Sequence, residues 1–130
     1  MLHIIYNKEM PDYVFHLAAH FANQNSVDNP EYDLMVNGRG ILKVLQYAQL
    51  IDVERFVYSS SGCGVYGLDS KMPFEEHDVS ISLHTPYQVT KLIGELYANY
   101  FHIPLSRPYQ EGIVLKSILR KSNIEITAVV

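Results

Sequence analysis

The sequence predicts an α/β fold with a doubly wound parallel sheet, on the strength of two observations. Short apolar runs at residues 13–18 and 55–59 have the length and the aromatic and β-branched content of buried strands. Longer stretches between and after them repeat apolar residues at helical spacing. Alternating strands and helices form a parallel sheet covered by helices, and ligands bind beyond the carboxyl ends of such strands.

The first strand, Tyr13–Ala18, ends in small residues. Asn29 and Pro30 then predict a helix start, because Asn is a common N-cap and Pro fits the first helical position. Gly38 and Gly40 lie inside this helix and each weakens it by about 1 kcal/mol relative to alanine, so we expect packing or a cofactor to require them. Its apolar positions are Leu34, Ile41, Leu42, Leu45 and Ala48.

The second strand, Arg55–Ser59, leads into further serines. Thr85 and Gln88 form a predicted capping box around Pro86, so a helix should begin at Pro86 and run to about Phe101, with Leu92, Leu96 and Tyr100 on one face. The pattern also predicts a polar loop over residues 68–84, a strand over 104–108, a helix over 113–120 and a strand over 124–130.

Composition indicates one soluble domain in 130 residues, of which 48% are hydrophobic. A net charge of -4 argues against nucleic-acid binding, and no apolar run is long enough to cross a membrane. The single Cys63 and the lack of a signal-peptide pattern lead us to expect a reducing, cytoplasmic location. His16 and His20 have no third ligand nearby, so no metal site is expected.

Tyr87 and Lys91 indicate a specific chemistry. Four residues apart on one helix, they share a face. The ammonium of Lys91 should lower the pKa of the Tyr87 phenol from its ordinary value of about 10, which would make Tyr87 a base. The spacing alone is common, and an ordinary amphipathic helix with a surface lysine is the alternative.

Five segments in order make the chain resemble the NAD-dependent epimerase/dehydratase family, the extended short-chain dehydrogenase/reductases that include nucleoside-diphosphate-sugar epimerases. They are Asp12–Ala19, Asn37–Gly40, Phe56–Ser61 with Val65–Gly67, Pro86–Lys91 and Arg107–Tyr109. The resemblance covers about residues 12–109 and implies a Rossmann-like NAD-binding domain, with residues 110–130 unassigned.

The resemblance also implies roles. Tyr87 resembles the general base, Lys91 the residue that binds the nicotinamide ribose and holds the phenolate, and Ser61 the hydroxyl that bonds the substrate oxygen. The implied cofactor is NAD, the implied substrate is a nucleotide sugar, and the implied cofactor-binding residues are Ala18, Ala19, Asn37, Ser59, Tyr87, Lys91 and Pro108. The alternatives are plain packing for the two alanines and a surface helix position for Asn37.

The loop before Val65–Gly67 is one residue longer than the family pattern. Counting from the strand selects Ser61 as the catalytic serine, whereas counting back from Tyr66 selects Gly62, which has no hydroxyl. We therefore choose Ser61 and keep Ser60 in reserve.

Two further departures bear on the reaction. Dehydratases and decarboxylases of the family carry an acidic residue where this chain has Gly62–Gly64, which favours an epimerase or a simple oxidoreductase. Gln110 stands where the family has Asn, at a position associated with the sugar nucleotide.

The family's Gly-rich phosphate loop and substrate region have no counterpart in this sequence. We therefore expect a fragment: residues 1–130 would form an incomplete NAD-binding domain lacking the first βαβ unit, inactive and binding NAD weakly or not at all. An exposed sheet edge would favour aggregation or a homodimer. The alternative function is a non-catalytic α/β remnant or interaction module without a cofactor.

Overall fold

The computed structural model describes residues 2–21, 23–61, 66, 75 and 80–102. The strands and helix predicted at 104–108, 113–120 and 124–130 lie outside these residues, as do Pro108 and Gln110.

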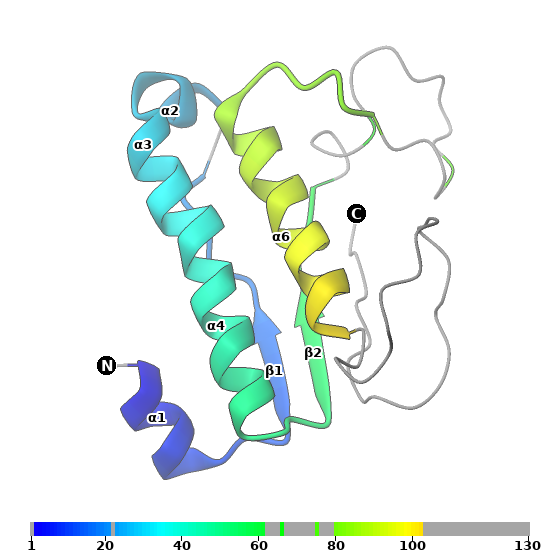
Figure 1. Ribbon diagram of the computed structural model, residues 1–130. Coiled ribbons are helices and arrows are strands. Elements are labelled where there is room, and N and C mark those ends of the chain that lie inside the picture. Colours follow the sequence, from blue (N-terminus) through cyan, green and yellow to red (C-terminus); the bar gives the residue numbers. More distant parts are fainter. Residues whose placement is uncertain (1, 22, 62–65, 67–74, 76–79, 103–130) are drawn as a thin grey trace.

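The described elements alternate as the sequence pattern requires (Figure 1). Strands β1 and β2 are parallel neighbours, with Tyr13 opposite Arg55 and His16 opposite Tyr58. The predicted α/β fold with adjacent parallel strands is therefore confirmed. In chain order the elements are α1 (Leu2–Glu9), β1 (Tyr13–His16), α2 (Asn23–Asp28), α3 (Pro30–Asp33), the π-helix η1 (Leu34–Gly38), α4 (Arg39–Leu50), β2 (Arg55–Tyr58) and α6 (Pro86–His102).

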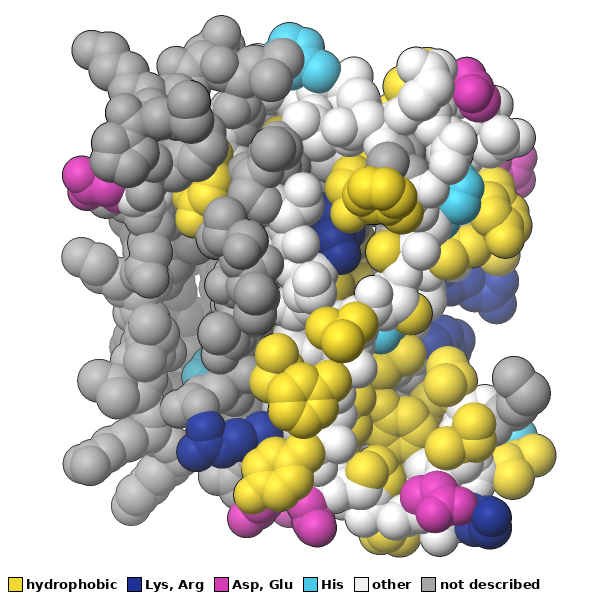
Figure 2. Space-filling model, turned by 180° about the vertical axis from the view of Figure 1, so that it is seen from behind, with side chains coloured by type: hydrophobic (Ala, Val, Ile, Leu, Met, Phe, Trp, Pro, Cys, Tyr) yellow, Lys and Arg dark blue, Asp and Glu magenta, His cyan; other side chains and the backbone are white. Residues whose placement is uncertain are grey.

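Helices α4 and α6 lie side by side over one face of the sheet, and α1 packs against α4. On the opposite face Tyr13, Phe15 and Leu17 are exposed, Phe15 to 67%. Figure 2 views the molecule from behind the helices and shows hydrophobic side chains gathered on this side. The doubly wound arrangement expected from the sequence is thus present on one face only among the described residues.

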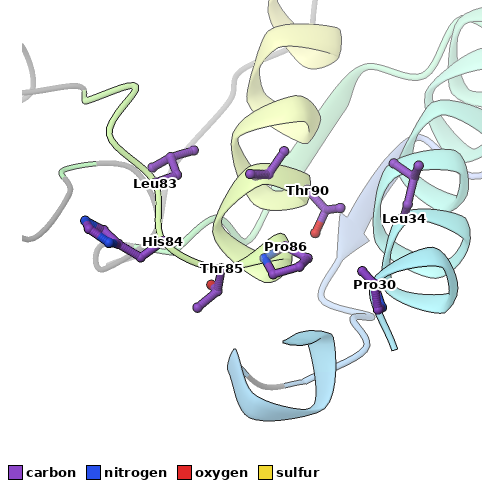
Figure 3. A pocket seen from close by; sticks show the side chains of 8 residues that line it. Pro30, Leu34, Leu83, His84, Thr85, Pro86 and Thr90 are labelled. Atoms are coloured by element: carbon purple, nitrogen blue, oxygen red, sulfur yellow. The ribbon is translucent and has the colours of Figure 1, made fainter. Parts of the chain in front are cut away.

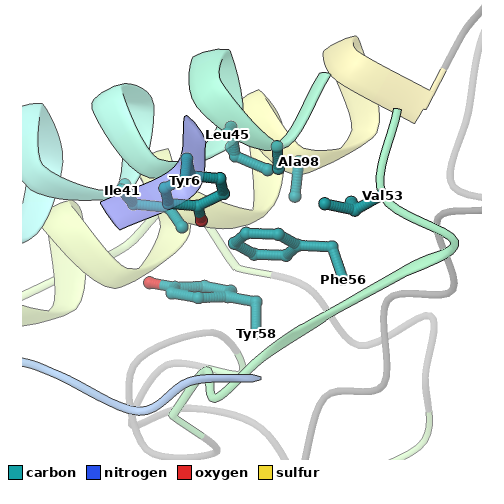
Figure 4. Packing of buried hydrophobic residues seen from close by; sticks show 8 residues of the cluster. Tyr6, Ile41, Leu45, Val53, Phe56, Tyr58 and Ala98 are labelled. Atoms are coloured by element: carbon teal, nitrogen blue, oxygen red, sulfur yellow. The ribbon is translucent and has the colours of Figure 1, made fainter. Parts of the chain in front are cut away.

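The core lies between the two helices and the sheet (Figure 4). Because side chains alternate along a strand, Phe56 and Tyr58 of β2 both point toward the helices and are buried. Helix α4 contributes a buried stripe at helical spacing. The whole cluster comprises Tyr6, Ile41, Leu45, Ala48, Val53, Phe56, Tyr58 and Ala98.

The buried face of helix α6 is not the apolar face that the sequence predicted. Its buried residues are mostly small or polar, namely Gln88, Thr90, Lys91, Gly94 and Ala98. Two residues of the apolar face recognised in the sequence, Leu96 and Tyr100, are instead exposed. The helix therefore turns a polar face inward, toward the carboxyl end of β2.

The space available for a side chain differs among the three glycines of these helices. A Cβ at Gly94 would overlap the buried Tyr58 side chain, so α6 approaches β2 more closely than any other residue would allow. A Cβ at Gly38 would meet only the Leu34 side chain, and one at Gly40 would meet nothing within 4 Å. The expected packing reason is therefore wrong for Gly40.

Candidate functional site

The first turn of α6, which carries Tyr87, is held by the predicted capping box. The Gln88 N–H donates to Thr85 Oγ1 at 3.3 Å, and Gln88 Oε1 accepts from the Thr85 N–H at 3.1 Å. The same Oε1 accepts from the His84 N–H at 2.7 Å. This reciprocal arrangement fixes where the helix begins.

Helix α2, which the sequence pattern did not predict, adds a second cap. Ser26 is fully buried, and its Oγ accepts a hydrogen bond from the Tyr87 N–H at 3.0 Å. Thr85 Oγ1 donates to Asn23 Oδ1 at 3.0 Å. The backbone of Tyr87 is thus anchored from outside its own helix.

Lys91 is buried, with only 4% of its surface exposed, so the alternative of a surface lysine is wrong. Its Nζ donates to the carbonyl oxygen of Ser59 at the end of β2. The same ammonium lies 4.8 Å from the ring centroid of Tyr58 and 5.9 Å from that of Tyr87. Lys91 therefore joins the Tyr87 face of α6 to the serine end of the strand.

The pKa of Tyr87 is raised by burial and, secondarily, by the negative charge of Asp33. The expectation that Lys91 lowers this pKa is therefore wrong for the free chain. Burial lowers the pKa of Lys91, while Glu95 and Asp33 oppose that effect. The lysine is directed at a carbonyl rather than at the phenol, so its attraction for a phenolate is weak in this arrangement.

The serines after β2 are not equivalent. The Ser60 hydroxyl donates to the Glu95 carboxylate of α6. Burial raises the pKa of Glu95, and the bond from Ser60 and the charge of Lys91 act against that rise. The Ser59 N–H donates to the His16 carbonyl at 3.2 Å and continues the ladder between the strands. Ser61, the residue after Ser60, is half-buried.

Asn37 is buried rather than on the surface, which contradicts the surface alternative. Its Oδ1 accepts from the His20 N–H at 2.7 Å, and its Nδ2 donates to the His20 carbonyl at 3.1 Å. It lies within π-helix η1, where the Arg39 N–H donates to the Leu34 carbonyl five residues back. Asn37 thus clamps the loop that follows β1.

That loop contains Ala18 and Ala19. Ala18 is exposed and Ala19 half-buried, so neither belongs to the hydrophobic core. They lie at the carboxyl end of β1, beside the carboxyl end of β2 and its serines. The plain-packing alternative therefore does not fit Ala18.

Three residues of this region were missed from the sequence. Asp33 is fully buried and bonded to Asn37, Thr90 bonds to Asp33, and Glu95 bonds to Ser60. Helical spacing could have indicated two of them, because Asp33 precedes Asn37 by four residues and Glu95 follows Lys91 by four.

A separate hollow of about 360 Å³ lies beside the start of α6 (Figure 3). It contains none of the serines, and neither Tyr87 nor Lys91. Its lining residues are Pro30, Leu34, Leu83, His84, Thr85, Pro86, Val89 and Thr90. Among the described residues there is no cluster of potential metal ligands, and no described helix could span a membrane.

One known protein family matches most of this chain. The model of the NAD dependent epimerase/dehydratase family matches residues 2–103. The chain belongs to this family.

Individual members of the family are clearly similar to the chain. A UDP-glucose 4-epimerase from Mycolicibacterium smegmatis is 37% identical over 91 residues, covering 70% of this chain and 29% of that protein. The structure of an epimerase from Methanothermobacter thermautotrophicus is 81% identical with a TM-score of 0.74, over 78% of this chain and 31% of that one. The structure of the UDP-glucose 4-epimerase from Thermotoga maritima, with UDP-glucose, is 33% identical with a TM-score of 0.74, over 78% and 33%.

The chain thus spans about a third of the length of these relatives. The comparisons confirm the predicted family and its Rossmann-like fold, with NAD as the cofactor of the family.

Proposed function

We propose that this chain carries the proton-transfer half of an NAD-dependent nucleotide-sugar epimerase site. Tyr87 is the base, Lys91 holds the phenolate and the nicotinamide ribose, and Ser61 bonds the substrate oxygen. The observation that carries the proposal is the hydrogen bond from Lys91 Nζ to the Ser59 carbonyl. It brings the Tyr87 face of α6 to the strand end where Ser61 lies.

The ammonium group of Lys91 has N–H donors that suit a ribose hydroxyl of the dinucleotide. An ammonium has three N–H donors, and the hydrogen bond from Lys91 to the Ser59 carbonyl uses one of them. A ribose hydroxyl suits the remaining donors. Ala18 and Ala19 leave room for close backbone approach, and Pro108, outside the described residues, is assigned to the cofactor on the family resemblance alone.

Asn37 serves the cofactor indirectly in this proposal. Its amide oxygen and nitrogen are both engaged with the backbone of His20. It therefore holds the loop against which the cofactor lies.

The reaction begins when the Tyr87 oxygen takes the proton of a sugar hydroxyl that Ser61 orients. NAD, when bound, supplies a hydride acceptor and a positively charged ring. Burial and Asp33 raise the pKa of Tyr87, so the free chain holds the phenol protonated at neutral pH. For Tyr87 to act as the base, the ammonium group of Lys91 must move closer to the phenol oxygen, where its positive charge stabilises the phenolate.

The 130-residue chain alone is proposed to be inactive and to bind NAD weakly or not at all, because its sequence has no Gly-rich stretch before Ala18 to hold a pyrophosphate. The competing proposal is a non-catalytic interaction module. Calorimetry with NAD tests the proposed weak binding, and micromolar affinity of this chain for NAD would contradict it.

We further propose a cytoplasmic location, because the chain has a single cysteine, Cys63, and a homodimer, because apolar side chains are exposed.

The residue roles are best tested in a chimera. Residues 2–102 of this chain would replace the matching segment of the Methanothermobacter epimerase, which is 81% identical. Tyr87→Phe should lower the turnover of UDP-sugar by about 10²–10⁴-fold, the usual contribution of a positioned acid or base. Lys91→Met should weaken both NAD affinity and turnover.

The matched control is Tyr97→Phe, on the outer side of the same helix, where the side chain is 38% exposed. It should leave turnover unchanged. Full activity of the Tyr87→Phe chimera would contradict the proposed mechanism.

A further inference from the structure

The carboxylate of Asp33 is fully buried and is shared by three structural elements. Thr90 Oγ1 of α6 donates to Asp33 Oδ2 at 2.6 Å, and Asn37 Nδ2 of η1 donates to Asp33 Oδ1 at 2.9 Å. His20 Nδ1, in the loop after β1, lies 3.2 Å from the same Oδ1 and donates to it when the proton is on Nδ1. A buried carboxylate with several donors strongly favours one arrangement of its partners.

These partners lie on opposite sides of the site. His20 and Asn37 define the loop that carries Ala18 and Ala19, where the dinucleotide is expected. Thr90 lies between Tyr87 and Lys91 on α6. Asp33 therefore bonds both the clamp of the loop after β1 and the helix with the base, and a longer direct bond of 3.4 Å from Asn37 Nδ2 to Thr90 Oγ1 lies beside it.

We propose that Asp33 is a positioning residue for the reaction, which locks the cofactor loop to the Tyr87–Lys91 helix and sets the charge felt by the base. This inference rests on the proposed function, because it assigns Asp33 to the same site. In this role Asp33 acts through its hydrogen-bonded partners.

The charge of Asp33 also reaches Tyr87. Among the described residues, the titratable groups around Tyr87 are Asp33 from α3, Lys91 from its own helix and Tyr58 from β2. Burial is the main cause of the raised pKa of Tyr87, and among these groups Asp33 is the one whose charge raises it further. Its removal should therefore lower that pKa, and a merely structural role would not require such a change.

The test uses the full 130-residue chain and neither readout requires NAD or turnover. Asp33→Asn keeps the shape of the side chain and removes its charge. The Tyr87 titration is followed by carbon NMR of tyrosine Cζ, assigned with Tyr87→Phe. The His20 amide, which donates to Asn37, is followed by hydrogen exchange.

In Asp33→Asn the pKa of Tyr87 should fall and the His20 amide should exchange about tenfold faster, since a charge-assisted bond to Asn37 becomes a neutral one. The control is Asp28→Asn on α2, whose exposed carboxylate bonds Gln24. It should alter neither readout. An unchanged or higher pKa of Tyr87 in Asp33→Asn would overturn the proposal.

Thr90→Val supplies an independent test if Asp33→Asn does not fold. It removes the bond from Thr90 to Asp33 and the longer bond that Thr90 Oγ1 accepts from Asn37, and it leaves the charge of Asp33 in place. The His20 amide should again exchange faster, although Thr90 has no hydrogen bond to His20. Unchanged exchange would show that the loop and the helix are not coupled, and would overturn the proposal while leaving the epimerase function standing.

Discussion

The Ser60 hydroxyl donates a hydrogen bond to the Glu95 carboxylate, which joins the segment after β2 to the middle of α6. Ser60 is therefore occupied within the protein. Ser61, the next residue, is half-buried and lies at the same strand end. This arrangement supports the choice of Ser61, made from counting along the strand, as the serine that meets the substrate.

In the chimera described above, Ser61→Ala should lower turnover by about 10²-fold, because a hydrogen bond to the developing charge on the substrate oxygen is lost. Ser60→Ala should reduce turnover less. It should also raise the pKa of Glu95 further, because the bond from Ser60 holds that pKa down. Carbon NMR of the Glu95 carboxyl group measures this change. A larger loss of turnover in Ser60→Ala would move the catalytic role to Ser60.

Two glycine substitutions in helices should have opposite effects on stability. Gly40→Ala adds a methyl group where nothing lies within 4 Å, so it should raise the free energy of unfolding by about 1 kcal/mol through helix propensity. Gly94→Ala places the same methyl group against buried Tyr58 and should lower that free energy by about 1–3 kcal/mol. Urea denaturation of both variants is the measurement. Equal effects would mean that α6 does not approach Tyr58 as closely as described.

His16 should make stability depend on pH. Burial, and then the charge of Lys91, lowers its pKa from 6.5 to about 4. Between these values the unfolded chain binds a proton that the folded chain does not, so stability should fall as pH falls from about 6.5 to about 4. Below that window the contribution of His16 is lost and no longer changes.

The pH prediction is measured as the difference between the parent chain and His16→Gln, because the raised pKa of Glu95 has the opposite effect on stability. The difference in unfolding free energy should shrink steadily from pH 7 to pH 4. His84→Gln, on the exposed segment before α6, is the control. A difference that is constant across this range would contradict the burial of His16 in the folded chain.

Self-association should involve the uncovered face of the sheet. Phe15 projects there with 67% of its surface exposed, next to a strand edge that no described strand pairs. Phe15→Lys should therefore shift sedimentation toward the monomer. The matched change is Leu96→Lys on α6, where Leu96 is 60% exposed and borders Ile93, Tyr97 and Tyr100. A monomer produced by Leu96→Lys alone would place the contact on the helices.

Local sequence signals predicted the parts of the fold that depend on neighbouring residues. The capping box of Thr85 and Gln88 and the start of α3 at Pro30 are present as expected, although the Asn29 side chain makes no capping bond. The two strands were found because their apolar content is concentrated in short runs. Helix α2 was missed because its six residues are mostly polar, and it is held by bonds to the distant α6.

The candidate site was only partly predictable, because some of its interactions join residues that are far apart in the sequence. Tyr87 and Lys91 share a helix face by spacing alone, and the structure brings that face to the serines. The raised pKa of Tyr87 depends on burial and on Asp33, which stands 54 positions earlier by the numbering (87 − 33). No helical spacing relates two such residues, so their interaction requires the three-dimensional structure.

The π-helix η1 has a consequence for insertions and deletions. A π-turn is a helical turn with one additional residue, and each residue of an α-helix corresponds to a rotation of about 100°. Deleting one residue among Leu34, Met35 and Val36 would permit an uninterrupted α-helix from Pro30 to Leu50. A bulge of this kind takes up its additional residue locally, so the deletion would restore ordinary α-turns while Asp33 stays on the face that meets Thr90. An alignment gap of one residue in this segment would therefore leave the connection between the loop and α6 in place, whereas a deletion within α4, which has no additional residue to lose, would rotate the chain before it by about 100°.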